Sequence, residues 1–202
     1  MGVKSTQPVH IKKYPVLGAN FIGLNTLEID MSDNLRINEL AFKGLRVQIE
    51  TTTSFNEVVR RLHVLCGDSS VSQVVSLAKQ NLSEEKFTEE VKERFVGESG
   101  FMLFHEINHG GWMTSFGIER KMVRWILGNP LIAITMLRHD LTAGLFAPVE
   151  LLITEQDGGM GCVLTYIKPS TLIVMNDDKA LRSAAEALDQ KFAALVSRLA
   201  EC

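Results

Sequence analysis

The sequence predicts an α+β fold in two layers, with about five strands in a mixed or antiparallel sheet, helices on one face and a long C-terminal helix. Three observations carry this prediction. Strand-like runs alternate with helical runs, a glycine-rich turn joins the last two strand-like runs, and an amphipathic helix closes the chain. With 202 residues, 46% of them hydrophobic, the chain is long enough for one domain with a substantial core.

The composition excludes several classes of protein. A net charge of only −3 at this apolar content argues against intrinsic disorder and against nucleic-acid binding. No uninterrupted apolar run is long enough to cross a membrane, and the N-terminus lacks the apolar stretch of a signal peptide, so we expect a cytoplasmic protein. Cys66, Cys162 and Cys202 form no C-x-x-C pair, which favours free thiols in a reducing compartment.

Residues 1–43 show no sustained periodicity and are interpreted as an N-terminal extension, with a short strand near residues 21–24. Residues 44–202 are predicted to form a single α+β domain. The chain starts Met1-Gly2-Val3-Lys4-Ser5-Thr6, a pattern compatible with myristoylation of Gly2, although such a short match often occurs by chance. Its few lysines favour a solvated arm over a nucleic-acid contact.

The first half of the domain begins with alternating apolar and polar residues over 45–52, which predict a half-buried strand. Ser54 and Glu57 then have the spacing of a capping box, and apolar residues at helical spacing continue to Gly67, a natural stop. Residues 70–80 and 83–96 are predicted to form two surface helices.

In the second half, residues 101–109 and 121–127 are expected to form strands, followed by a short helix over 131–138. Residues 149–155 and 161–168 are predicted to form a hairpin, because Asp157-Gly158-Gly159 between them is a strong turn signal.

The terminal helix is predicted over residues 178–200. Its apolar residues repeat every four and three positions, in a heptad stripe formed by Leu181, Ala185, Leu188, Phe192, Leu195 and Leu199. Two interpretations remain open. The stripe covers one face of the sheet, or the helix also packs on a partner subunit.

The string His105-Glu106-Ile107-Asn108-His109 matches the H-E-x-x-H pattern of zinc proteases. That chemistry needs a helix, because both histidines must lie on one face. Here residues 101–109 alternate like a strand, with Phe101, Leu103, His105, Ile107 and His109 on one side. Residues four apart in a strand are separated by roughly 13 Å, too far to share a metal ion. We therefore predict no metal site, and no cofactor motif is present.

The positions of the two tryptophans and of His63 in the sequence pattern predict whether their side chains are buried or exposed. Trp125 alternates with apolar neighbours and is expected in the core, whereas Trp112 follows two glycines and is a candidate for a ligand or interface contact. His63 is on the polar side of its predicted helix and is expected to be solvated.

Taken in order, these pieces resemble the family known as domain of unknown function 302. The opening Thr52–Leu62 is similar to the family's "T...S-x-x-E-t-x-x-r-L" string. Ile107-Asn108-His109 takes the place of its Ile-Asp-His string, and Gly128-Asn129-Pro130 matches a Gly-Asn-Pro strand end. Ala147–Leu151 and Leu164–Ile167 match a Pro-x-hydrophobic strand and a hairpin.

The resemblance covers about residues 44–180 and implies a Thermus-type two-layer α+β fold and a homodimer. It departs from the family in three respects. Asn108 replaces an acid, residues 68–99 are longer than the usual link, and residues 1–43 and the long terminal helix are additions. The family has no settled activity, so the resemblance implies a fold more firmly than a function.

Our first functional hypothesis is a small-molecule-binding or regulatory homodimer. Its pocket is expected near the ends of the strands that carry His109 and Asn129, with Asn108, Trp112 and Asn129 as binding residues. The alternative is a non-hydrolytic acid–base enzyme, such as an isomerase or cyclase, with His109 as the base and Glu106 or Tyr166 as the second proton-transfer group. A third hypothesis is a protein–protein interaction module that uses the terminal helix and N-terminal arm.

Overall fold

The computed structural model describes residues 37–201. The chain divides into two compact units, Met1–Ala41 and Phe42–Cys202, and the helices and strands described below all belong to the second. The expected strand near residues 21–24 and the expected modification of Gly2 lie outside the described residues. Within those residues, no helix is both long and apolar enough to cross a membrane.

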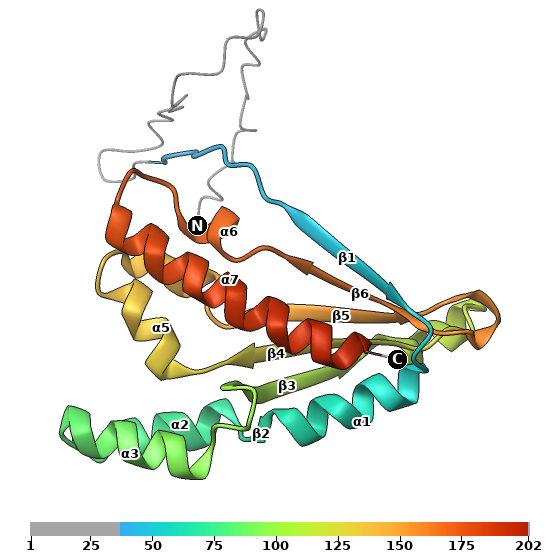
Figure 1. The fold of residues 1–202 in the computed structure, drawn as a ribbon, viewed down its shortest axis with the longest axis horizontal. Helices are drawn as coiled ribbons and strands as arrows, with labels where there is room; N and C mark the ends of the chain where they lie inside the picture. Colours follow the sequence, from blue (N-terminus) through green and yellow to red (C-terminus); the bar gives the residue numbers. More distant parts are fainter. Residues whose placement is uncertain (1–36, 202) are drawn as a thin grey trace, which may run out of the picture. The chain divides into compact units, whose positions relative to one another are not determined.

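The centre of the domain is a six-stranded mixed sheet with the order β1-β6-β5-β4-β3-β2 (Figure 1). All neighbours are antiparallel except β2 and β3, which are parallel. The strands are β1 (Arg46–Thr51), β2 (Gly67–Asp68), β3 (Met102–Asn108), β4 (Met122–Gly128), β5 (Val149–Glu155) and β6 (Cys162–Ile167). The prediction of about five strands missed β2, because a two-residue strand is too short to show a period.

The helices also follow the predicted order, with short additions. They are α1 (Phe55–Leu65), α2 (Val71–Ala78), α3 (Glu84–Arg94), α4 (His109–Met113), α5 (Pro130–Leu137), α6 (Ser170–Ile173) and α7 (Lys179–Ala200), with 3-10 turns η1 (Thr114–Phe116), η2 (Leu141–Leu145) and η3 (Asp157–Gly159). The capping box predicted at Ser54 is present in part: Ser54 accepts from the Glu57 backbone N–H, but Glu57 itself bonds Arg60 and Arg61. The predicted turn between β5 and β6 is confirmed, with Gly158 and Gly159 at positive φ.

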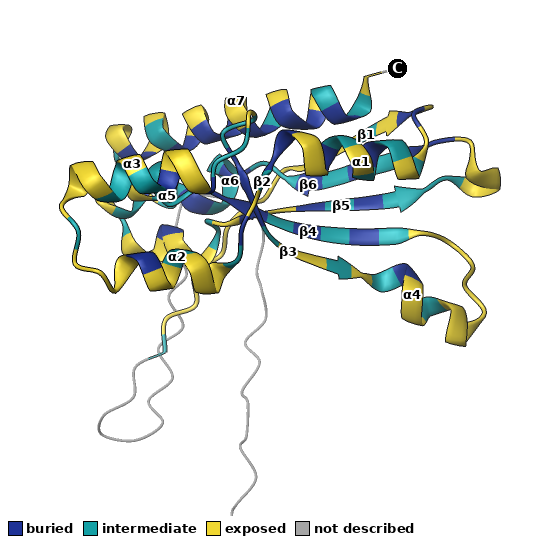
Figure 2. Cartoon of the chain, turned by 90° about the horizontal axis from the view of Figure 1, so that it is seen from below, coloured by how far each residue is buried: buried dark blue, intermediate teal, exposed yellow. Residues whose placement is uncertain are grey.

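Helices α1 and α7 cover one face of the sheet, which makes the two-layer architecture visible in Figure 2. All six residues of the predicted heptad stripe in α7 are at most 3% exposed and belong to the core of this chain. Trp125, as expected, lies in the same core and is fully buried. The stripe therefore covers one face of the sheet, and a partner subunit would have to contact other residues of α7.

No helix covers the middle of the opposite sheet face among the described residues (Figure 2). We call this the open face. It carries partly buried apolar side chains between charged ones, among them Ile107, Arg124, Ile126, Glu150 and Leu152. Arg124 and Glu150 are directly paired across it.

The segment that contains α2 and α3 begins near Gly67 and ends near Gly97, and the backbone passes itself closely at these two glycines. The backbone N–H groups of Gly67 and Gly97 both donate to the carbonyl of Phe101, at 3.0 and 3.1 Å. A Cβ atom on Gly67 would approach the Phe95 carbonyl oxygen within 1.7 Å, and one on Gly97 would approach the Gly67 nitrogen within 2.3 Å. Only residues without a side chain fit this crossing.

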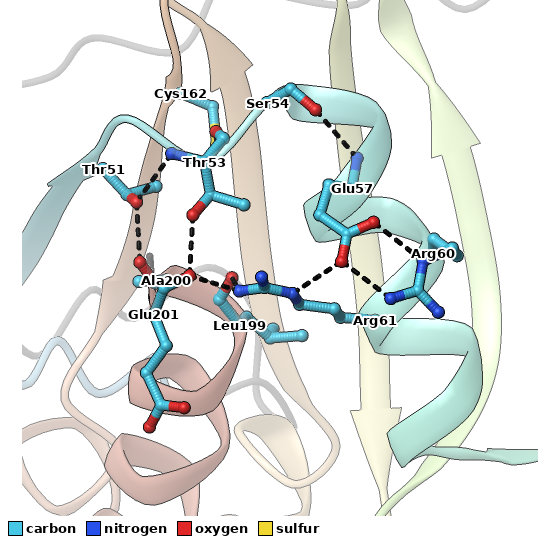
Figure 3. Close-up of polar contacts among 10 residues, drawn as sticks. All are labelled: Thr51, Thr53, Ser54, Glu57, Arg60, Arg61, Cys162, Leu199, Ala200 and Glu201. Atoms are coloured by element: carbon cyan, nitrogen blue, oxygen red, sulfur yellow. Dashed lines mark hydrogen bonds and ion pairs between the residues drawn. The ribbon is translucent and has the colours of Figure 1, made fainter.

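Side chains from β1, from the turn that follows it and from α1 hold the C-terminal end of α7 (Figure 3). Thr51 donates to the carbonyl of Ala200 at 2.6 Å, and Thr53 donates to that of Glu201 at 2.7 Å. Arg61 donates to the carbonyls of Leu199 and Glu201 while Glu57 accepts from its Nε. The last carbonyls of a helix have no partner within it, so these three donors anchor α7 on the sheet.

Candidate functional site

The candidate site is centred on the Glu106 carboxylate, on the face of β3 that looks toward α1. Glu106 is opposite Trp125 in the register, so the two side chains share this face. The indole Nε1 of Trp125 donates to Glu106 Oε2 at 2.7 Å, and His63 Nε2 lies 3.2 Å from the same oxygen. The Glu106 side chain remains 38% exposed. A carboxylate is thus fixed by a buried indole and an imidazole while still open to solvent.

A β-bulge between Leu103 and His105 turns Glu106 toward α1. Strict alternation would place Leu103, His105 and Ile107 on one face. The bulge interrupts that pattern, so Leu103 and Glu106 face the core while His105 and Ile107 face the open side. Bulges commonly re-aim a side chain next to a functional site. The strand predicted for the H-E-x-x-H string is present up to Asn108, but the predicted faces are exchanged beyond the bulge.

His63 reaches Glu106 from α1, where we expected it to be merely solvated. Its side chain is half exposed, and the carboxylate lies at one of its ring nitrogens. Phe55 and Val59 precede it by eight and four residues, so the three lie along one flank of the helix. This four-residue spacing is the feature of the sequence from which the place of His63 beside the site could have been predicted.

Glu106 forms part of the wall of a cavity of about 590 Å³ between the start of α1 and the ends of β3, β4 and β5. Its lining combines apolar, polar and charged groups: Phe55, Asn56, Val59, Glu106, Asn108, Gly110, Gly111, Thr114, Glu119, Arg120, Lys121, Val123 and Glu155. The volume is in the range of ordinary ligand pockets.

The basic side chains of the cavity are already paired. Lys121 Nζ lies 3.0 Å from Glu155 Oε1 and 5.8 Å above the Phe55 ring. The hydrogen bond from Lys121 lowers the pKa of the Glu155 carboxyl. Arg120 donates to the Glu155 carbonyl and lies 3.1 Å from Asp157. Glu106 and Glu119 therefore leave an excess of negative charge in the wall.

The other residues expected near this strand end serve local structure. Asn108 caps α4, because its side chain accepts from the Gly111 backbone N–H at 3.0 Å. His109 begins that helix instead of ending the strand. Its ring packs edge-on against Trp112 at 5.9 Å, and Trp112 packs against Phe116 at 6.1 Å. Asn108 lines the cavity, whereas His109 and Trp112 do not.

Asn129 and Tyr166 do not join Glu106. Because β3 and β4 are antiparallel, Asn129 lies at the opposite end of the sheet, roughly 20 Å along the strands from Asn108. There it caps α5 and donates to the Gly100 carbonyl. Tyr166 lies three strands from Glu106, roughly 14 Å away, and packs under α7 on Phe192. Burial raises the pKa of its hydroxyl.

The geometry defines a two-layer α+β domain with a ligand-sized polar cavity at one sheet end. Within the described residues, no group of three or more His, Cys, Asp or Glu side chains is arranged to hold a metal ion. What this arrangement can do is bind a polar ligand through an oriented carboxylate and exchange protons with it.

The chain belongs to the family described as domain of unknown function DUF302, whose model matches residues 75–199. It is similar to the crystal structure of an uncharacterized conserved DUF302 protein from Bacillus stearothermophilus, with a TM-score of 0.51 and 21% identity, covering 76% of this chain and 97% of that one. No curated protein sequence matches the chain. The family match begins later than the predicted residue 44 and includes most of α7, so the terminal helix is not an addition to the family's fold.

Proposed function

We propose that this protein binds a small molecule in the cavity beside Glu106. The observation that carries the proposal is the Glu106 carboxylate itself, which Trp125 and His63 hold at the wall of a 590 Å³ space. A pocket with few fixed polar groups in a partly apolar wall is the usual form of a ligand site. Phe55 and Val59 supply the apolar part of this wall.

The charges of the wall favour a cationic ligand, such as a small amine. Arg120 and Lys121 are occupied by Asp157 and Glu155, whereas Glu106 and Glu119 have no cationic lysine or arginine partner among the described residues. A protonated amine against Glu106 would gain a charge-assisted hydrogen bond. A carboxylate ligand would instead meet like charges.

The proposal is tested by titrating the protein with a panel of small primary amines and matched carboxylates in a calorimeter. We expect at least one amine to bind and Glu106→Gln to weaken it by about tenfold or more. Glu150→Gln, which makes the same change on the open face, is the control and should bind like the wild type. Equal affinity of Glu106→Gln, or selective binding of carboxylates, would contradict the proposal.

A second candidate is an acid–base enzyme that acts in the same cavity. The observation in its favour is the 3.2 Å contact between His63 and Glu106, since an imidazole beside a carboxylate is a common proton-transfer pair. His63 replaces His109 as the proposed base. Conversion of a bound amine with a sigmoidal pH profile, abolished in His63→Ala and retained in His109→Ala, would support this candidate.

A homodimer and a cytoplasmic location remain part of the proposal. The free, buried thiols of Cys66 and Cys162 support a reducing compartment. Since the α7 stripe is buried, the open face is the surface we propose for a second copy, because Ile126 and Leu152 lie at its centre. Light scattering should give a dimer mass for the wild type and a monomer for Leu152→Lys; a monomeric wild type would refute the dimer.

A further inference from the structure

We propose that the opposite end of the sheet holds a second binding site, for a compact, uncharged, apolar group. A pocket of about 180 Å³ lies there between α2, α5 and the sheet. Of the residues that line it, all but Asn129 have apolar or no side chains, and the wall includes Val74, Phe104, Leu127, Ala133, Met136 and Leu188. It shares no lining residue with the cavity beside Glu106.

The single polar side chain in the wall already makes a hydrogen bond through each of its two polar atoms. Asn129 Oδ1 accepts from the Leu131 backbone N–H at 2.8 Å, and its Nδ2 donates to the Gly100 carbonyl at 2.9 Å. Both contacts fix the start of α5. The wall contains no charged side chain, so a charged group entering the pocket would lose its hydration without an opposite charge to compensate it.

The pocket is built from regular elements and reaches into the core. Leu127 and Met136 are fully buried, and Leu188 is 3% exposed. The Phe104 ring lies directly against Gly128, where a Cβ atom would approach Phe104 Cε2 within 2.5 Å. A side chain at residue 128 would displace this ring, so the glycine keeps one wall of the pocket in place.

The size of the space indicates the size of the ligand. Protein interiors are close-packed, and few natural voids exceed the volume of a water molecule. An engineered apolar cavity of roughly 150 Å³ is known to stay dry and to bind benzene. The pocket beside α5 is slightly larger, so a benzene-sized ring, alone or as the end of a larger uncharged ligand, fits it.

The test is a titration of the full chain with benzene, followed by methyl NMR signals. We expect saturable shifts of the Leu127, Met136 and Leu188 methyl groups, and none for exposed methyl groups such as that of Met160. Benzoate, which has the same ring with a charge, should bind at least tenfold more weakly. Absence of saturable shifts in the wild type would overturn the proposal whatever the variants do.

Ala133→Leu is the variant that fills the pocket from α5, and leucine is compatible with the helix. It should weaken benzene binding at least tenfold. Ala194→Leu makes the same change at an exposed position of α7 and should bind like the wild type. Unchanged affinity in folded Ala133→Leu would also overturn the proposal, while amine binding beside Glu106 should be unaffected in every case.

Discussion

The two ends of the sheet differ in how they use their side chains. At the end near Glu106, charged groups line an open cavity, and Thr51, Thr53 and Arg61 hold the end of α7 through its carbonyls. At the other end, apolar side chains surround a smaller pocket, and its single polar side chain caps α5. The end near Glu106 is therefore suited to recognise a ligand by its charge, and the other end to recognise a ligand by its shape alone.

The difference follows from the antiparallel pairing of β3 and β4. His109 follows the end of β3 and Asn129 follows the end of β4, so two motifs only twenty residues apart are carried to opposite ends of the sheet. The expectation of one pocket near both residues is wrong for this reason. Strand-end motifs converge in parallel sheets, whereas neighbouring antiparallel strands separate them.

The largest expected effect is at the apolar end. Leu188→Asp places a carboxylate in the core next to Met136 and Leu127, where nothing compensates its charge. We expect the free energy of unfolding to fall by more than about 4 kcal/mol, measured by urea denaturation. Leu188→Met should cost less than about 1.5 kcal/mol. If Leu188→Asp stayed as stable as the wild type, α7 would not pack as described.

Arg61→Ala examines the other end of α7. It removes the donor to the carbonyls of Leu199 and Glu201, and we expect a loss of about 2 kcal/mol in urea denaturation. Arg60→Ala is the matched control, because in the described part of the chain Arg60 bonds Glu57 in an exposed pair and no carbonyl of α7, so this variant should unfold at nearly the same urea concentration as the wild type. Equal losses in the two variants would mean that the carbonyl contacts add nothing.

Trp125→Phe tests what the indole of Trp125 contributes to stability and to amine binding at the end near Glu106. The variant keeps most of the buried ring but leaves Glu106 without its indole donor. We expect a loss of about 1–3 kcal/mol by thermal unfolding, together with weaker amine binding. Trp112→Phe, at an exposed position, should stay within about 0.5 kcal/mol. Unchanged amine binding in Trp125→Phe would indicate that the indole does not orient the carboxylate.

The smallest expected effect concerns pH. Hydrogen bonds from Arg60 and Arg61 lower the pKa of Glu57 from 4.5 to about 2. Its contribution to stability is therefore present above pH 4.5 and is lost as the pH falls toward 2. Urea midpoints measured across that window should fall less steeply for Glu57→Gln than for the wild type. Parallel curves would show that this carboxyl does not couple to folding.

Much of the fold could be predicted, because its main elements carry strong local signals. The Ser54 cap, the glycines between β5 and β6 and the stripe of α7 each identify one element independently of the others. The two-residue β2 and the bulge in β3 depend on strand pairing and could not be predicted from local pattern.

The site could be predicted only in part, because it too depends on strand pairing and packing that no local pattern shows. Glu106 and Asn108, two of the predicted site residues, line the cavity, but the bulge decides which face of the strand they occupy. His63 is distant in sequence from Glu106, and only the packing of α1 beside β3 brings them together. Tyr166 and Asn129 had suitable chemistry, yet the sheet order and strand direction place them elsewhere.

The crossing at Gly67 and Gly97 bears on how the family could diversify. The α2–α3 segment exits and re-enters at a single point, so its length can change without displacing any strand of the sheet beyond β2. Yet Val74 of α2 forms part of the apolar pocket. Exchange of the α2–α3 segment would thus change which ligands the apolar pocket prefers while the rest of the sheet is kept. The segment is therefore a suitable target for evolution and for the grafting of other loops.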